Sequence, residues 1–77
     1  MDPMDLRQAF ANNLRRLRHA KGISQEELAY AAGVNRTYLS RLEKGVSYPG
    51  LEIITKLANV LECEPAELLR ISSRPNT

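Results

Sequence analysis

The side chains best suited to binding chemistry lie in one short segment. With each residue placed 100° on from the last, five residues of this segment share an arc of about 140°. These five are polar, three are cationic and none is acidic: Arg36, Thr37, Ser40, Arg41 and Lys44. Long donors without a carboxylate suit the base edges and phosphates of a duplex. We interpret this side as a DNA-contacting face; a merely solvated helix face is the alternative, although acidic residues are usual there.

The same inventory argues against catalysis. The 77 residues include one histidine and one cysteine, so they offer no metal-ligand cluster and no internal disulfide, and we expect no cofactor. No glycine-rich phosphate loop and no convincing Ser–His–carboxylate trio occur, and a domain this small has no deep pocket. We therefore expect a protein that is not an enzyme. Cys63 is interpreted as a small core hydrophobe rather than a redox switch, because no second thiol is present.

Length and charge distribution are consistent with this interpretation. We expect one domain at residues 1–71 and a frayed polar tail at 72–77. Residues 7–44 carry eight Lys or Arg against three Glu, whereas residues 45–77 carry three against four. Positive charge on one part of a domain suits a phosphate backbone. Without a long apolar run or a secretory leader, we expect no membrane partner and a cytoplasmic location.

Five helices are expected to position the polar face, and strand patterns are nearly absent. Ser24 and Glu27 form the spacing of a capping box, Asn35 is placed to cap a helix, and Pro65 suits a first helical position. Glycines follow three of the predicted helices, where they end the helical pattern. The expected ranges are about 5–21, 24–32, 35–44, 50–61 and from 64 onward.

The second and third predicted helices have the pattern of a helix-turn-helix. Ala29 is small enough to let the two helices approach closely, and Gly33 permits the tight reversal between them. Leu39 and Leu42 then hold the pair against the rest of the core. A general corner between two helices, without a DNA role, is the alternative.

Glu43 is the exception on the apolar side of the third helix. A buried carboxylate needs a partner, and Arg18, near Leu14 and Leu17 on the first helix, is the expected cation. We predict an ion pair that ties the first helix to the third. The alternative is two residues at the edge of the core that both reach water.

The segment SQEELAYAAGVNRTYLSRLEKG, with the later LEIITKLANVL and EPAELL, resembles the lambda-repressor/Cro-like (XRE) family. The resemblance covers about residues 6–69 and implies an all-α, five-helix DNA-binding domain. It implies a sequence-specific transcriptional regulator that binds a pseudo-palindromic duplex operator as a homodimer, like restriction-modification controllers or small phage repressors. RNA polymerase is a further implied partner. The alternatives are a protein-interaction module or an antitoxin on the same scaffold.

The resemblance also implies residue roles. Base reading would fall to Asn35, Arg36, Thr37 and Arg41. Phosphate or backbone contacts would come from Gln25, Tyr38, Lys44, Ser47, Tyr48, Gly50 and Leu51. Arg18 and Glu43 match the inter-helix ion pair of the family.

Some positions are left open by the sequence. Arg15 and Arg16 either reach a phosphate or are simply solvated. Glu62 stands where the family usually has glycine, so the turn there is expected to be strained or differently shaped. Dimer contacts are expected from the fourth and fifth helices, with Ile71 contributing.

Overall fold

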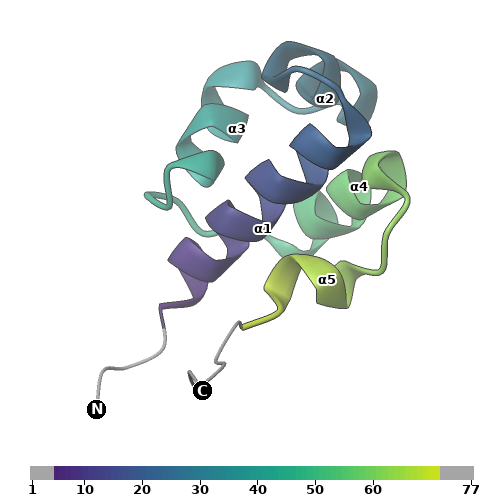
Figure 1. Cartoon of the computed structure of the whole chain (residues 1–77). Coiled ribbons are helices and arrows are strands. Elements are labelled where there is room, and N and C mark those ends of the chain that lie inside the picture. Colours follow the sequence, from purple (N-terminus) through teal and green to yellow (C-terminus); the bar gives the residue numbers. More distant parts are fainter. Residues whose placement is uncertain (1–4, 72–77) are drawn as a thin grey trace.

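A computed structural model describes residues 5–71, which form five helices and no strand in that range (Figure 1). The helices are α1 (Leu6–Lys21), α2 (Gln25–Ala32), α3 (Arg36–Glu43), α4 (Leu51–Leu61) and α5 (Pro65–Leu69). The predicted all-α, five-helix architecture is confirmed, with differences of about a residue at helix ends. The expected tail at 72–77 lies outside the described residues.

The predicted helix starts are made by side-chain caps. Ser24 accepts a hydrogen bond from the Glu27 backbone N–H, and the Glu27 carboxylate accepts one from the Ser24 N–H, completing the capping box. Asn35 caps α3 by accepting from the Tyr38 backbone N–H. Asp5 caps α1 in the same way, through the Gln8 N–H. Local sequence therefore sets where these three helices begin.

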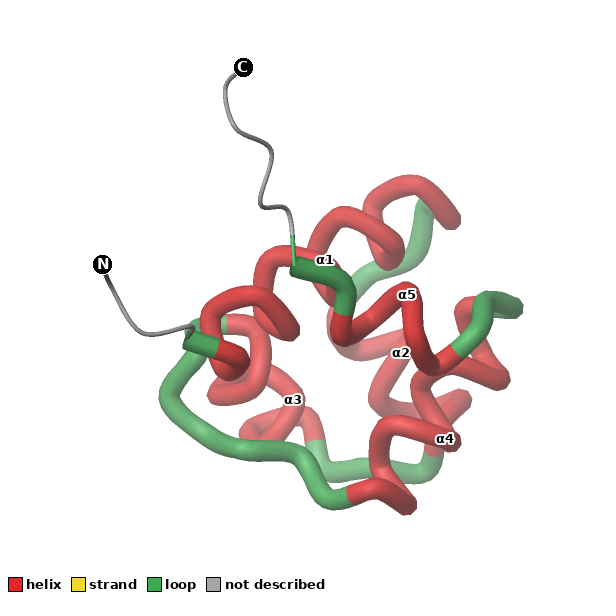
Figure 2. Tube along the Cα trace, turned by 90° about the horizontal axis from the view of Figure 1, so that it is seen from below, coloured by secondary structure: helices red, strands yellow, loops and turns green. Residues whose placement is uncertain are grey.

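The core is an apolar cluster to which all five helices contribute. α1 crosses the molecule and packs against α3, α4 and α5, while α2 packs against α3 and α4 (Figure 1). Seen from below, the loop between α3 and α4 runs along one side of the molecule (Figure 2). The largest fully buried side chains are Phe10, Leu14, Leu28, Leu39, Leu42, Leu57 and Leu68.

One buried polar residue was missed by the sequence analysis. The Asn13 side-chain amide donates to the backbone carbonyls of Leu68 and Arg70, both at 2.9 Å. Carbonyls at the end of a helix lack partners within the helix, so α1 supplies the donor that α5 needs. Asn13 thus fixes the end of α5 against α1.

The turn after α4 keeps its left-handed geometry without glycine. Glu62 has φ 57°, the one positive φ among the described non-glycine residues, so the strained alternative is the one observed. Its carboxylate accepts a hydrogen bond from Lys21 Nζ at 2.9 Å. That hydrogen bond and the lysine charge lower the pKa of Glu62 below its ordinary value.

Cys63, the next residue, was expected to be a small hydrophobe in the core; it is half-buried and packs against the core. Burial raises the pKa of its thiol, which keeps the thiol protonated and agrees with a packing role. Within residues 5–71 no group of His, Cys, Asp or Glu side chains is arranged to hold a metal ion. The described helices also include none with the length and apolarity needed to span a bilayer.

Candidate nucleic-acid interface

The outer side of α3 carries most of the residues predicted to read bases. Arg36, Thr37 and Arg41 are exposed, as is Lys44 just beyond the helix, while Ser40 is half-buried. On the opposite side Leu39 and Leu42 are fully buried and anchor α3 to the core. The structure therefore brings the predicted residues to one exposed, acid-free side of a rigidly packed helix. We call this side, with Asn35, the contact face.

Asn35 has a structural task as well as its predicted one. Its side-chain oxygen already accepts the Tyr38 N–H at 3.1 Å as the α3 cap. Bidentate reading of adenine uses both the oxygen and the nitrogen of an amide. While Asn35 acts as the cap, its amide N–H groups are what it has available for a base or phosphate.

The loop after α3 is attached to α3 by two side chains of that helix. Arg41 Nε donates to Ser47 Oγ at 3.1 Å, and the Tyr38 hydroxyl donates to the Tyr48 carbonyl at 3.4 Å. The half-buried Tyr38 ring also packs against the core. Residues predicted to contact phosphates are thus held beside those predicted to read bases, although they belong to different segments.

Glu43, on the buried side of the same helix, has charged and polar partners from two other helices. The Glu43 side chain is 3% exposed and accepts Arg18 Nε at 2.6 Å and Arg18 Nη2 at 3.0 Å. Gln25 Nε2 donates to the same carboxylate at 3.0 Å. The predicted partners therefore meet in a bidentate geometry. We call Arg18, Gln25 and Glu43 the buried charge cluster; it joins α1, α2 and α3.

Two further arginines of α1 have structural partners. Arg15 donates to the Glu43 backbone carbonyl at the end of α3, so it lies between α1 and α3 rather than freely in solvent. Its three-residue spacing from Arg18 places both on one side of α1, a signal that could have linked it to the cluster. Arg16 is exposed and donates to the Asn13 side-chain oxygen at 3.2 Å.

Gln25 belongs to the cluster and also begins α2. One hydrogen of its amide nitrogen is directed to Glu43, and a primary amide carries a second. Backbone N–H groups in the first turn of a helix have no partner within the helix. A phosphate contact by this residue, as the resemblance implies, would therefore use the second amide hydrogen and the start of α2. Sequence reasoning did not find its bond to Glu43, since no local pattern signals it.

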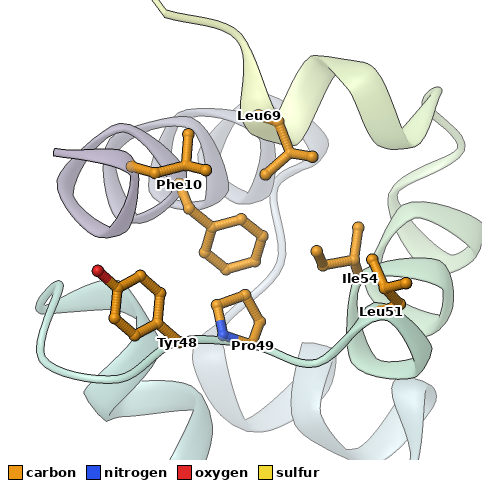
Figure 3. Close-up of a pocket in the computed structure, with 7 residues that line it drawn as sticks. Phe10, Tyr48, Pro49, Leu51, Ile54 and Leu69 are labelled. Carbon is orange, nitrogen blue, oxygen red and sulfur yellow. The ribbon is translucent and has the colours of Figure 1, made fainter. Parts of the chain in front are cut away.

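An apolar hollow of about 210 Å³ adjoins the far end of the loop (Figure 3). Leu51 at its edge is 81% exposed and Tyr48 is 68% exposed, so two large side chains that line the same apolar hollow are open to solvent. The Tyr48 ring lies beside Pro49 and Phe10 in the hollow, so Tyr48 and Leu51 belong to an apolar surface as well as to the loop (Figure 3). The lining residues are Leu6, Phe10, Tyr48, Pro49, Leu51, Ile54 and Leu69.

Comparison with known proteins gives consistent matches over most of the chain. The Helix-turn-helix family model HTH_3 matches residues 14–68. Control protein C.BamHI of Bacillus amyloliquefaciens is 33% identical over 73 residues, which cover 94% of this chain and 90% of that protein. The crystal structure of the restriction-modification controller protein C.AhdI from Aeromonas hydrophila is 45% identical with a TM-score of 0.78, over 80% of this chain and 94% of that one. The N-terminal DNA binding domain of SinR from Bacillus subtilis is 29% identical with a TM-score of 0.81, over 87% and 99%.

Proposed function

Because this chain belongs to the XRE-type helix-turn-helix family HTH_3, whose members are DNA-binding transcriptional regulators and not enzymes, we propose that it binds a pseudo-palindromic operator as a homodimer. The observation that carries the proposal is the contact face. It offers cationic and polar donors without a carboxylate on a helix that is fixed from behind by Leu39 and Leu42. Such a helix fits the major groove, where each base pair presents its own set of donors and acceptors.

The proposed roles divide the surface into two sets. Arg36, Thr37 and Arg41, with the Asn35 amide, read bases from the exposed side of α3. The second set surrounds them and holds the phosphate backbone, which fixes orientation rather than sequence. It consists of Gln25, Tyr38, Lys44, Ser47, Tyr48 and Gly50.

A second copy of the chain is the proposed occupant of the apolar hollow. Leu51 and Tyr48 are exposed there, and Ile71 is an exposed apolar residue after α5. A chain of 77 residues buries a small core, so an apolar contact between two copies adds burial that one copy lacks. Two-fold symmetry would then present the two α3 helices to half-sites about 10 base pairs apart.

The same proposal includes controller-like or repressor-like regulation in the cytoplasm, at the nucleoid. The match to this chain covers 90% of the controller protein C.BamHI and 94% of the controller protein C.AhdI, which favours a similar small regulator. A contact with RNA polymerase would fall on α2, where Tyr30 is 89% exposed and follows the exposed Glu26 by one turn. An exposed aromatic ring of this kind suits a protein partner.

Selection of binding sites from a random duplex pool at physiological salt tests the proposal. The expected result is enrichment of a two-fold-related motif with half-sites about 10 base pairs apart. Sedimentation of the free protein at tens of micromolar is expected to show a dimer. Enrichment of a single, unrepeated half-site with a monomer in sedimentation would contradict the dimer. Recovery of no motif would favour the protein-interaction module instead.

A further inference from the structure

Arg7, in the first turn of α1, has no polar partner among the residues that the structure describes. Among residues 5–71, Arg7, Arg36 and Lys44 are the basic residues whose side chains make no hydrogen bond or ion pair to another described residue. Arg36 and Lys44 belong to the contact face. Arg7 therefore shares its unpaired state with two residues of the proposed DNA surface, although it is distant from them in sequence.

An aromatic ring holds Arg7 in place. Its guanidinium carbon lies 4.8 Å from the centroid of the Tyr48 ring, within the range of a cation–π contact. Its Nε is buried and meets no acceptor in the described part of the chain. The ring thus restricts the guanidinium without accepting a hydrogen bond from it. The two Nη groups, unlike Nε, are not buried, and their N–H donors suit the oxygens of an anion.

The fold carries this site to the edge of the contact face. The first turn of α1 lies close against the loop after α3. The closeness is visible at Gly45, where an added Cβ would be 3.0 Å from Gln8 Oε1. Tyr48 is in that loop, and its neighbour Ser47 is bonded to Arg41 of α3. A continuous row therefore runs from the contact face through the loop to Arg7.

From this row we infer that Arg7, stacked on Tyr48, binds a backbone phosphate of the duplex next to the phosphates assigned to Lys44 and Ser47. The inference rests on the proposed DNA binding and adds a phosphate contact from α1. Its chemistry is a guanidinium–phosphate ion pair, with an arginine already ordered by the ring before DNA arrives. A phosphate contact carries no base information, so it raises affinity for all sequences alike.

The alternative role is packing, since Tyr48 also lines the apolar hollow and Arg7 covers its ring. A packing role would change thermal stability but would not change how binding depends on salt. Counterion release makes the slope of log affinity against log salt count the phosphates that are neutralised, about 0.9 for each. The salt slope is therefore the readout that separates the two roles.

The test uses Arg7→Met, which keeps the apolar stem, and Arg7→Lys, which keeps the charge. Each full-length variant is titrated against a random-sequence duplex of about 30 base pairs and against the selected operator, over a salt series. We expect Arg7→Met to lower the affinity for both duplexes by a similar factor, roughly 3- to 10-fold at low salt. It should also lower the salt slope by about 1 per protomer. Arg7→Lys should keep most of the slope.

Arg16→Met is the matched control. Arg16 lies nine positions along α1 from Arg7, about 180° around the helix, and bonds to Asn13 on the α5 side. We expect it to leave the slope unchanged, and a melting curve for each variant checks that it is folded. Wild-type binding with an unchanged slope in Arg7→Met would overturn the inference and leave the proposed function standing. A wild type that binds neither duplex would overturn both.

Discussion

The buried charge cluster and the contact face lie on opposite sides of α3 and use charge in opposite ways. In the cluster the Glu43 carboxylate receives donors from both Arg18 and Gln25, and its side chain is almost fully removed from water. On the contact face Arg36 and Lys44 are exposed and have no polar partner within residues 5–71. The same helix and its C-cap therefore carry one charge that is paired inside the protein and others that are unpaired on the surface.

The difference follows from desolvation. A carboxylate taken out of water is tolerated where charged donors surround it, and those donors then fix the helices from which they come. A surface guanidinium remains hydrated, so leaving it unpaired costs the fold little stability. Paired charges thus position α3 against α1 and α2, and the unpaired ones are those to which we assign the proposed DNA contacts. The predictions that follow, taken from the largest effect to the smallest, test this division.

Removing the buried carboxylate should have the largest effect. Glu43→Ala leaves Arg18 buried without its partner and should lower the free energy of unfolding by about 3–5 kcal/mol. That is a large part of the roughly 5–15 kcal/mol expected for a small domain. Urea and thermal denaturation followed by circular dichroism measure the loss.

The double variant Arg18→Met with Glu43→Leu is the control for this prediction. It removes both charges together, so it should recover much of the stability that Glu43→Ala loses. A Glu43→Ala melting curve within one or two degrees of wild type would show that the pair is not effectively buried. The cluster would then resemble the contact face, and the comparison would fail.

Changes on the contact face should affect DNA binding and leave stability nearly unaltered. Arg36→Ala should weaken binding to the selected operator by about 1–3 kcal/mol and relax its base preference. Lys44→Ala should weaken all sequences alike and reduce the salt slope by about 1. Titrations of the operator and of single-base variants measure both effects. Uniform losses from both substitutions would assign Arg36 to the phosphate backbone instead of the bases.

The sequence predicted those features that depend on local patterns. Helix periodicity and the caps at Ser24 and Asn35 gave the five helices, and the apolar placement of Glu43 led to Arg18 as its partner. Asn13 carried an overlooked signal, because it lies three positions after Phe10 on the side of α1 that faces the core. Its acceptors lie 55 and 57 residues away, so their identity could not be read from the sequence.

The rest of the candidate site depends on contacts between distant segments. The bond from Gln25 to Glu43 and the stacking of Arg7 on Tyr48 join segments that no period or spacing relates. The predicted DNA residues could be named because they share one helix face or a family motif. Which of them are already engaged by the fold, as Arg41 is with Ser47, required the structure.

The ion pair of Lys21 with Glu62 is intermediate between the buried charge cluster and the contact face, because it is paired but exposed. Changing it should have the smallest effect on stability. Glu62→Gly relieves a left-handed backbone that glycine adopts readily, and it removes an ion pair that water screens. We expect relief of strain to outweigh the pair and to raise Tm by about 2–5 °C at neutral pH. Lys21→Gln, which removes the pair and keeps the strain, is the matched control and should lower Tm slightly.

Acid pH should increase the difference in Tm between the Glu62→Gly variant and wild type. Lys21 lowers the pKa of Glu62, so the stabilisation from this pair is present above the ordinary glutamate pKa and is lost as the pH falls through the lowered value. Glu62→Gly has no such carboxylate and does not lose this contribution, so its Tm advantage should grow as the solution is acidified. Thermal melts of wild type and both variants across this pH range measure the difference. A Glu62→Gly variant less stable than wild type at neutral pH would mean that an exposed ion pair outweighs backbone strain, and that pairing matters in this fold even where burial does not enforce it.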